Sequence, residues 1–74
     1  MENKWAIEKK EGKYIFEGRG ILSIFFDNVI IHKTNKSISF IYKDEVIASL
    51  QFGTHSILPM HLYSDLVYLK DTEL

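Results

Sequence analysis

GRGILSIFFDNVIIHK, residues 18–33, carries apolar side chains at odd and even positions alike. Most of these are Ile, Val and Phe, Asn28 stands in the middle of the run, and Ala, Glu and Gln are missing, so strand is favoured over helix. A helix is the rival, since Ser23 and Asp27 would share one helical face. We predict strands at residues 21–26 and 29–33, a tight turn at Asp27-Asn28, and a bulge or corner at residues 18–20.

These two strands raise the question of what covers their second apolar face. The outward set is either Ile21, Ser23 and Phe25 or Leu22, Ile24 and Phe26, and the sequence leaves both open. A sheet that curls or folds over itself covers one face only, so the other must meet another element or another chain. The C-terminal segment is the expected cover within the chain, and a second subunit is the alternative.

The remaining residues predict further strands, separated by turns. These strands lie at residues 5–10, 13–17, 37–42 and 46–52, with turns at Glu11-Gly12, 34–36 and 43–45. Alternation along the last two strands places one set of side chains inward: Ile38, Phe40, Tyr42, Val46, Ala48, Leu50 and Phe52. Residues 60–63 and 66–69 are predicted as a last hairpin, although Leu58, Leu62, Leu66 and Leu69 also fit one side of a helix. Residues 70–74 are expected to fray.

Together these segments predict an all-β fold. We expect a single small antiparallel domain over residues 1–74, with about six to seven strands and little or no helix. Its arrangement would be a curled sheet, a barrel or a sandwich.

Composition limits the classes of protein that fit. The chain has 74 residues, a net charge of −1, 46% hydrophobic residues and no cysteine. A core this small is marginal, and disulfides and thiolate metal sites are excluded, so packing or association must stabilise it. No apolar run reaches the length of a membrane span or of a secretory signal, so a cytoplasmic location is expected.

The middle of the chain resembles the small bacterial pleckstrin-homology-like (PH-like) domains. The matching pieces are GILSIFFDNVIIHK at 20–33 and ISFIYKDEVIASLQFG at 38–53, about half of the chain. The resemblance implies a binding module, not an enzyme, because that fold serves mainly as a scaffold for protein or lipid contacts. That family ends in a helix, whereas residues 64–74 are expected to make at most two turns. Lysine outnumbers arginine eight to one, which is typical of a low-GC bacterium or its phage.

No set of residues predicts catalysis, a metal or a cofactor. The chain has neither cysteine nor a G-x-S-x-G or S-x-x-K motif, so a catalytic set would have to be assembled from scattered residues such as Ser56, His61 and Asp65. His32, His55 and His61 are expected on a strand edge and in surface loops, with no metal between them. We expect a protein that is not an enzyme.

The leading hypothesis is a non-catalytic module that binds another protein through an apolar sheet face or an edge strand, with self-association as one form of it. The candidate binding residues are Trp5, Arg19, Phe25, Phe26 and Ile30.

Two alternatives remain. The first is a small barrel that binds single-stranded nucleic acid through Lys9, Lys10 and Lys13, but acidic residues alternate with these lysines, so nucleic acid is not the expected partner. The second is an inhibitor that a phage or mobile element encodes and that acts on a host enzyme. It differs from the leading hypothesis only in the biology of the partner.

Overall fold

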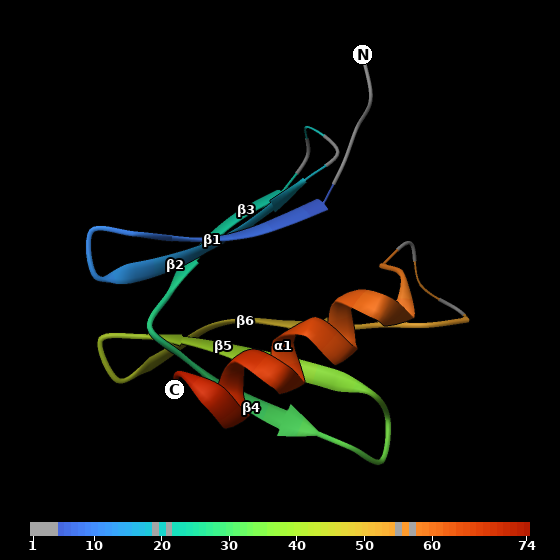
Figure 1. Cartoon of the computed structure of the whole chain (residues 1–74). Coiled ribbons are helices and arrows are strands. Elements are labelled where there is room, and N and C mark those ends of the chain that lie inside the picture. The colour runs from blue at the N-terminus through green and yellow to red at the C-terminus, as the bar shows by residue number, and fades with distance from the viewer. Residues whose placement is uncertain (1–4, 19, 21, 55, 57) are drawn as a thin grey trace.

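The computed structural model describes residues 5–18, 20, 22–54, 56 and 58–74, and its strands form two antiparallel sheets of three strands each (Figure 1). The elements are β1 (Trp5–Lys10), β2 (Lys13–Gly18), β3 (Leu22–Phe26), β4 (Asn28–His32), β5 (Ser37–Tyr42), β6 (Glu45–Gln51) and α1 (Met60–Thr72). The first sheet has the order β1-β2-β3 and the second has the order β4-β5-β6. The prediction of a small, mostly β, antiparallel domain is confirmed.

Two tight hairpins close the outer strand pairs. At the β1–β2 turn, Glu11 and Gly12 have φ angles of 53° and 80°, and at the β5–β6 turn Lys43 and Asp44 have φ angles of 52° and 66°. Positive φ at both central residues is what a type I′ turn requires, and this turn matches the twist of the strands it joins. Within each sheet, strands that are consecutive in the sequence lie next to each other.

One residue, Asp27, separates β3 from β4 and carries the chain from one sheet to the other. Its backbone N–H donates to the carbonyl oxygen of Ile41 at 2.8 Å. Its side-chain Oδ2 accepts a hydrogen bond from the backbone N–H of Lys43 at 3.0 Å. Asp27 thus ties the corner between the sheets to the β5–β6 hairpin.

The core lies between the facing sides of the two sheets and is rich in aromatic rings. The largest fully buried side chains are Phe16, Phe26, Phe40, Ile38, Leu66 and Val29. Phe16 of the first sheet stacks against Phe40 of the second, with 5.6 Å between ring centroids, and Phe26 meets Phe40 edge-on at 5.1 Å. Of the two sets left open for β3, the one that contains Phe26 therefore faces inward.

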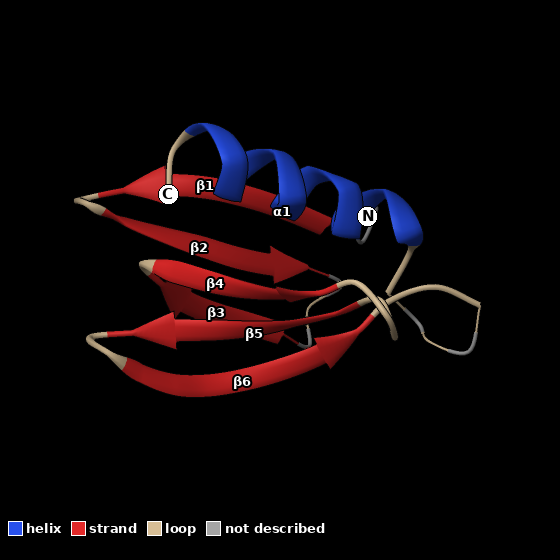
Figure 2. Cartoon of the chain, turned by 90° about the horizontal axis from the view of Figure 1, so that it is seen from below, coloured by secondary structure: helices blue, strands red, loops and turns tan. Residues whose placement is uncertain are grey.

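Residues 60–72 form a helix of 13 residues, so the predicted hairpin is wrong. The helical spacing of Leu62, Leu66 and Leu69 accounts for the difference, because all three are buried on one side of α1. Figure 2 shows α1 beside β1 and along one side of the two sheets. There the leucine stripe completes the core instead of adding a further strand pair. No described helix is long and apolar enough to cross a membrane.

The last residues, expected to fray, are packed in the structure. α1 continues through Thr72, the backbone N–H groups of Glu73 and Leu74 both donate to the carbonyl oxygen of Leu69, and Leu74 packs against the core. The hydroxyl of Tyr14 donates to Oε1 of Glu73 at 3.2 Å.

The predicted inward orientation of Val46 is wrong because β6 contains a bulge. Phe40 pairs with Ala48 whereas Ile41 pairs with Val46, so Ile47 is an extra residue in β6. Such an insertion shifts the alternation of every residue before it. Val46 was expected to face inward, but its side chain is 55% exposed.

Candidate docking surface

The structure does not bring together the four predicted binding residues that it describes, Trp5, Phe25, Phe26 and Ile30. Phe25 is 46% exposed on the outer face of the first sheet, and Ile30 is 44% exposed on the outer face of the second. Phe26 is fully buried and stays part of the core, so a partner cannot reach it without unfolding the chain. Trp5 is half-buried on the edge strand β1, and Arg19 lies outside the described residues.

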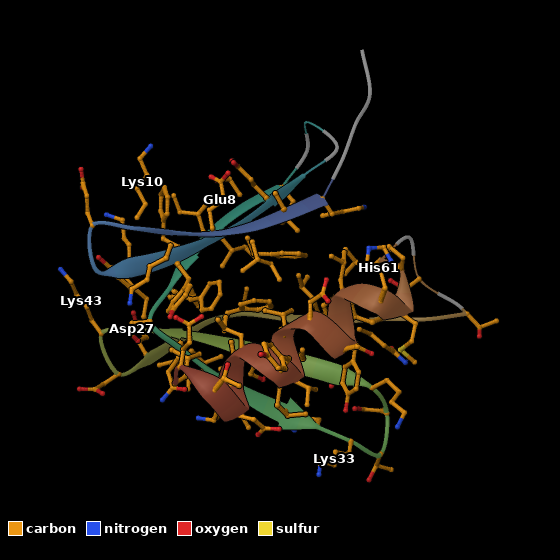
Figure 3. The ribbon with its side chains drawn as sticks, viewed as in Figure 1. Glu8, Lys10, Asp27, Lys33, Lys43 and His61 are labelled. Carbon is orange, nitrogen blue, oxygen red and sulfur yellow. The ribbon has the colours of Figure 1, made fainter. Side chains whose placement is uncertain are left out.

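The outer face of the first sheet forms a shallow hollow of about 430 Å³ with mixed charge. Its lining is Glu8, Lys10, Glu11, Lys13, Ile15, Glu17, Ser23 and Phe25. The Nζ atom of Lys13 lies 5.3 Å from the centroid of the Phe25 ring, which it partly shields. Figure 3 shows Glu8 and Lys10 on the side of this sheet that faces away from the second sheet. The C-terminal segment was expected to cover this apolar face. No residue of α1 lines the hollow, so that segment does not cover Phe25.

The three lysines of the nucleic-acid alternative are divided between two faces. Lys10 and Lys13 line the outer hollow, together with the carboxylates of Glu8 and Glu17. Lys9 pairs with Tyr14 on the opposite face of the sheet, and its Nζ lies 5.7 Å from that ring. A groove that follows a phosphate backbone needs adjacent positive charges, and this arrangement does not supply them.

A more apolar hollow of about 350 Å³ lies between β4 and α1, and we call it the β4 groove. It is lined by Val29, Ile30, Ile31 and Lys33 of β4 and by Val67, Lys70 and Asp71 of α1. Val29 is buried, Ile31 and Val67 are half-buried, and Ile30 is exposed. The apolar side chains therefore form the floor of the groove, and charged groups border it.

A polar contact fixes the helix beside β4. The Nζ atom of Lys70 donates to Oδ1 of Asn28 at 2.7 Å, and the same oxygen accepts a hydrogen bond from the backbone N–H of Val29 at 2.8 Å. This contact places Lys70 and Asp71 near the start of β4, whereas Lys33 follows its end, as Figure 3 shows for Lys33. The groove thus has the ammonium group of Lys33 at one end and the carboxylate of Asp71 at the other.

The strand that borders this groove has an open edge. In the described part of the chain, β4 pairs with β5 on one side and with no strand on the other. An edge strand presents backbone N–H and C=O groups that another extended segment can pair with. The β4 groove therefore combines backbone groups with an apolar floor.

The outer face of the second sheet continues from Ile30 toward β6. It carries Ile41, half-buried, and the side chains of Val46 and Ile47, which are 55% and 43% exposed. The bulge in β6 produces this exposure, and no periodicity in the sequence indicates it. The predicted residue Ile30 therefore belongs to a larger apolar surface.

Beside this surface, a line of hydrogen bonds crosses all three strands of the second sheet. Nε2 of His32 lies 3.0 Å from Oγ of Ser39, which lies 2.9 Å from Oγ of Ser49. Ser39 is the buried member of the line, so these contacts satisfy a hydroxyl group that water does not reach. The line stabilises the pairing of β4, β5 and β6.

The scattered residues considered for catalysis are not assembled into a triad. The hydroxyl of Ser56 donates to the carbonyl oxygen of Gln51 at 2.7 Å and accepts a hydrogen bond from the backbone N–H of Leu58 at 3.1 Å. Ser56 thus stabilises the loop before α1. Among the described residues, no three His, Cys, Asp or Glu side chains lie close enough together to hold a metal ion, and His55 falls outside those residues.

Comparison of the chain with family models, with curated proteins and with solved structures finds no match.

Proposed function

We propose that this chain is a non-catalytic protein-binding module that takes an extended segment of a partner protein into the β4 groove. The observation that carries the proposal is the open edge of β4 next to an apolar hollow. An extended segment pairs its backbone with such an edge, while its side chains fill the adjacent hollow. Strand addition gives affinity, and the hollow selects the sequence.

The charges at the groove define the chemistry of the partner segment. A carboxylate on the partner would meet Lys33 at the end of β4, and a basic side chain would meet Asp71 near its start. Between them, an apolar side chain would cover Ile30, which is 44% exposed. Full burial of an isoleucine contributes roughly 1.5–3 kcal/mol, so covering the exposed part contributes about 1 kcal/mol. Backbone pairing must supply much of the remaining affinity.

We further propose that the chain is a small PH-like domain. Two antiparallel sheets followed by a C-terminal helix support this proposal, because a short C-terminal segment was the departure expected from that family and α1 has 13 residues. A binding role is what this resemblance implies.

A peptide selection tests the binding proposal. A random peptide library displayed on phage is selected against the folded chain, and selected peptides are titrated into labelled protein while backbone amide shifts are recorded. We expect peptides with an apolar residue flanked by one acidic and one basic residue, and shifts concentrated in β4 and α1. Failure to enrich any peptide, or shifts confined to the first sheet, would contradict the proposal.

Two matched substitutions make the test specific. Ile30→Glu and Phe25→Glu each place a carboxylate at a position of nearly equal exposure, 44% and 46%, on opposite outer faces. We expect Ile30→Glu to weaken peptide binding at least tenfold and Phe25→Glu to leave it within twofold. Equal effects of the two substitutions would remove the β4 groove as the binding surface.

Light scattering of the chain alone tests the self-association form of the hypothesis. A monomer over the whole concentration range is expected, with the groove open for a foreign segment. A dimer that Ile30→Glu dissociates would show that a second copy occupies the groove, and this would overturn the assignment to a foreign partner.

A further inference from the structure

A second groove lies on the opposite side of α1, between this helix and β1, and we call it the Trp5 pocket. It encloses about 270 Å³ and is lined by Trp5, Ala6 and Ile7 of β1 and by His61, Leu62, Asp65, Tyr68 and Leu69 of α1. It shares no residue with the β4 groove. A ligand bound there would therefore contact other side chains than those of the function proposed above, and the two sites can be tested separately.

Helical spacing gathers the polar side chains of this pocket. His61, Asp65 and Tyr68 stand at positions i, i+4 and i+7, so they lie along one side of α1. Tyr68 is 71% exposed, which means that the core does not require its ring. The buried leucines of α1 pack the helix against the core. His61, Asp65 and Tyr68 are therefore available for contacts outside the domain.

Trp5 forms the opposite wall from the sheet side. Its ring stacks on Phe16 with 5.4 Å between centroids and 14° between planes, so one face of the indole is held by the core. Trp5 as a whole is half-buried and lines the pocket. The packing against Phe16 fixes the orientation of the indole before any ligand binds.

Four aromatic rings elsewhere in the described chain have a lysine ammonium group nearby, and the two rings of this pocket do not. Within the described ranges, a lysine Nζ lies 5.3–5.7 Å from the ring centroids of Tyr14, Phe25, Tyr63 and Tyr42. Among the described residues, no lysine Nζ lies over the ring of Trp5 or Tyr68, and no lysine or arginine lines the pocket. Two aromatic rings and the carboxylate of Asp65 thus line a pocket to which the described part of the chain contributes no ammonium or guanidinium group.

We infer that the Trp5 pocket binds an organic cation, a quaternary ammonium or a guanidinium group. Such cations are attracted to the faces of Trp and Tyr rings, and they are desolvated more easily than a primary ammonium ion. Asp65 supplies the negative charge that a neutral aromatic pocket would lack. The volume of about 270 Å³ is slightly below the range of pockets for drug-sized ligands, so it fits one cationic head group and not a larger cofactor.

Choline and its uncharged isostere, 3,3-dimethylbutan-1-ol, test this inference. Each is titrated into the protein at constant ionic strength while the fluorescence of Trp5, the single tryptophan, is recorded. We expect a saturable change with choline and at least fivefold weaker binding of the isostere, because the cation–aromatic and carboxylate contacts need the charge. Equal binding of both compounds, or no saturable response to choline up to tens of millimolar, would overturn the inference.

Variants separate the cation site from a general effect on the fold. Tyr68→Ala and Asp65→Asn should each weaken choline binding about threefold to fivefold, whereas Tyr68→Phe should retain it within twofold because the ring remains. Asp44→Asn, which removes a carboxylate in the β5–β6 turn, is the charge-matched control and should have no effect. An equal loss in Asp44→Asn and Asp65→Asn would show that net charge, and not the pocket, controls binding.

Two sources of the cation are distinguished by a further titration. A short peptide that carries trimethyl-lysine or arginine is compared with free choline or guanidinium. Binding of the peptide at least tenfold tighter than the free cation would assign the pocket to a protein side chain, and equal binding would assign it to a small molecule. If neither peptide nor free cation binds, the inference fails, whatever the outcome of the peptide selection at the β4 groove.

Discussion

Two adjacent phenylalanines in β3 should differ sharply in their contribution to stability. Phe26 is fully buried and contacts the rings of both Tyr14 and Phe40, with centroids 5.5 Å and 5.1 Å away. Replacing a core phenylalanine by alanine costs about 3–5 kcal/mol. Phe25 is 46% exposed and contacts Lys13, so Phe25→Ala should cost only about 1–2 kcal/mol.

The larger loss is a substantial part of the total stability. At roughly 0.05–0.15 kcal/mol per residue, the free energy of unfolding of a 74-residue domain is about 4–11 kcal/mol. Phe26→Ala would therefore unfold a domain at the low end of this range and would remove roughly a third to a half of the stability of one at the high end. Phe26→Leu, compared with Phe25→Leu, keeps the comparison measurable if the alanine variant does not fold.

Urea unfolding followed by Trp5 fluorescence measures both variants, because this ring stacks on Phe16 in the core. The midpoint should fall much further for the substitutions at position 26 than for those at position 25. A cost at position 25 equal to or above that at position 26 would refute the orientation of β3 and, with it, the pairing of the whole first sheet.

Three other outcomes are expected. Burial raises the pKa of Tyr14 above its ordinary value of 10.0, and the charge of Glu73 and the hydrogen bond to it raise this pKa further. The neutral phenol therefore stabilises the fold below about pH 10, and this contribution is lost as pH rises through the raised pKa. The urea midpoint should therefore fall in strongly alkaline buffer, and less so in Tyr14→Phe; an unchanged fall in that variant would assign the effect to other groups. Asn28→Ala removes the acceptor shared by Lys70 and the backbone of Val29 and should cost about 1–3 kcal/mol in urea unfolding, with a double-mutant cycle against Lys70→Met showing coupling between the two side chains. A labelled single-stranded oligonucleotide should not be retained at low salt, and retention that disappears steeply with added salt would instead support the nucleic-acid alternative.

The strands of this fold were predicted well because each strand is marked by residues within its own segment. β-branched and aromatic runs bounded by turn residues placed six strands close to their observed bounds, and the Glu11-Gly12 turn was recognisable from glycine. The C-terminal helix was missed because its leucines fit both a helix and a hairpin, and the choice depends on whether the sheets leave an opening that a helical stripe can fill. That opening is a tertiary feature.

The candidate surface was less predictable for a related reason. Ile30, Phe25 and Phe26 were all named as candidate binding residues, and the first two are exposed whereas Phe26 is buried. Which of Phe25 and Phe26 faces outward depends on the pairing of β3 with β2. The exposure of Val46 arises from one inserted residue, Ile47, and alternation alone gives no sign of it. The groove between β4 and α1 requires the helix, so no pattern within β4 could indicate it.

The order in which the chain pairs also bears on how the domain folds and opens. Within each sheet the paired strands are consecutive in the sequence, so the sheets assemble through short loop closures. The C-terminal segment that contains α1 instead makes distant contacts, such as that of Tyr14 with Glu73 just after the helix, 59 residues apart. We expect α1 to dock after the main folding barrier, with a φ-value near 0 for Leu66→Ala; a value near 1 would contradict this order. The last element to join should be the first to detach under native conditions, a difference that hydrogen exchange in α1 would reveal. Since α1 forms one wall of both the β4 groove and the Trp5 pocket, a single local opening would abolish both proposed binding sites together while the two sheets remained paired.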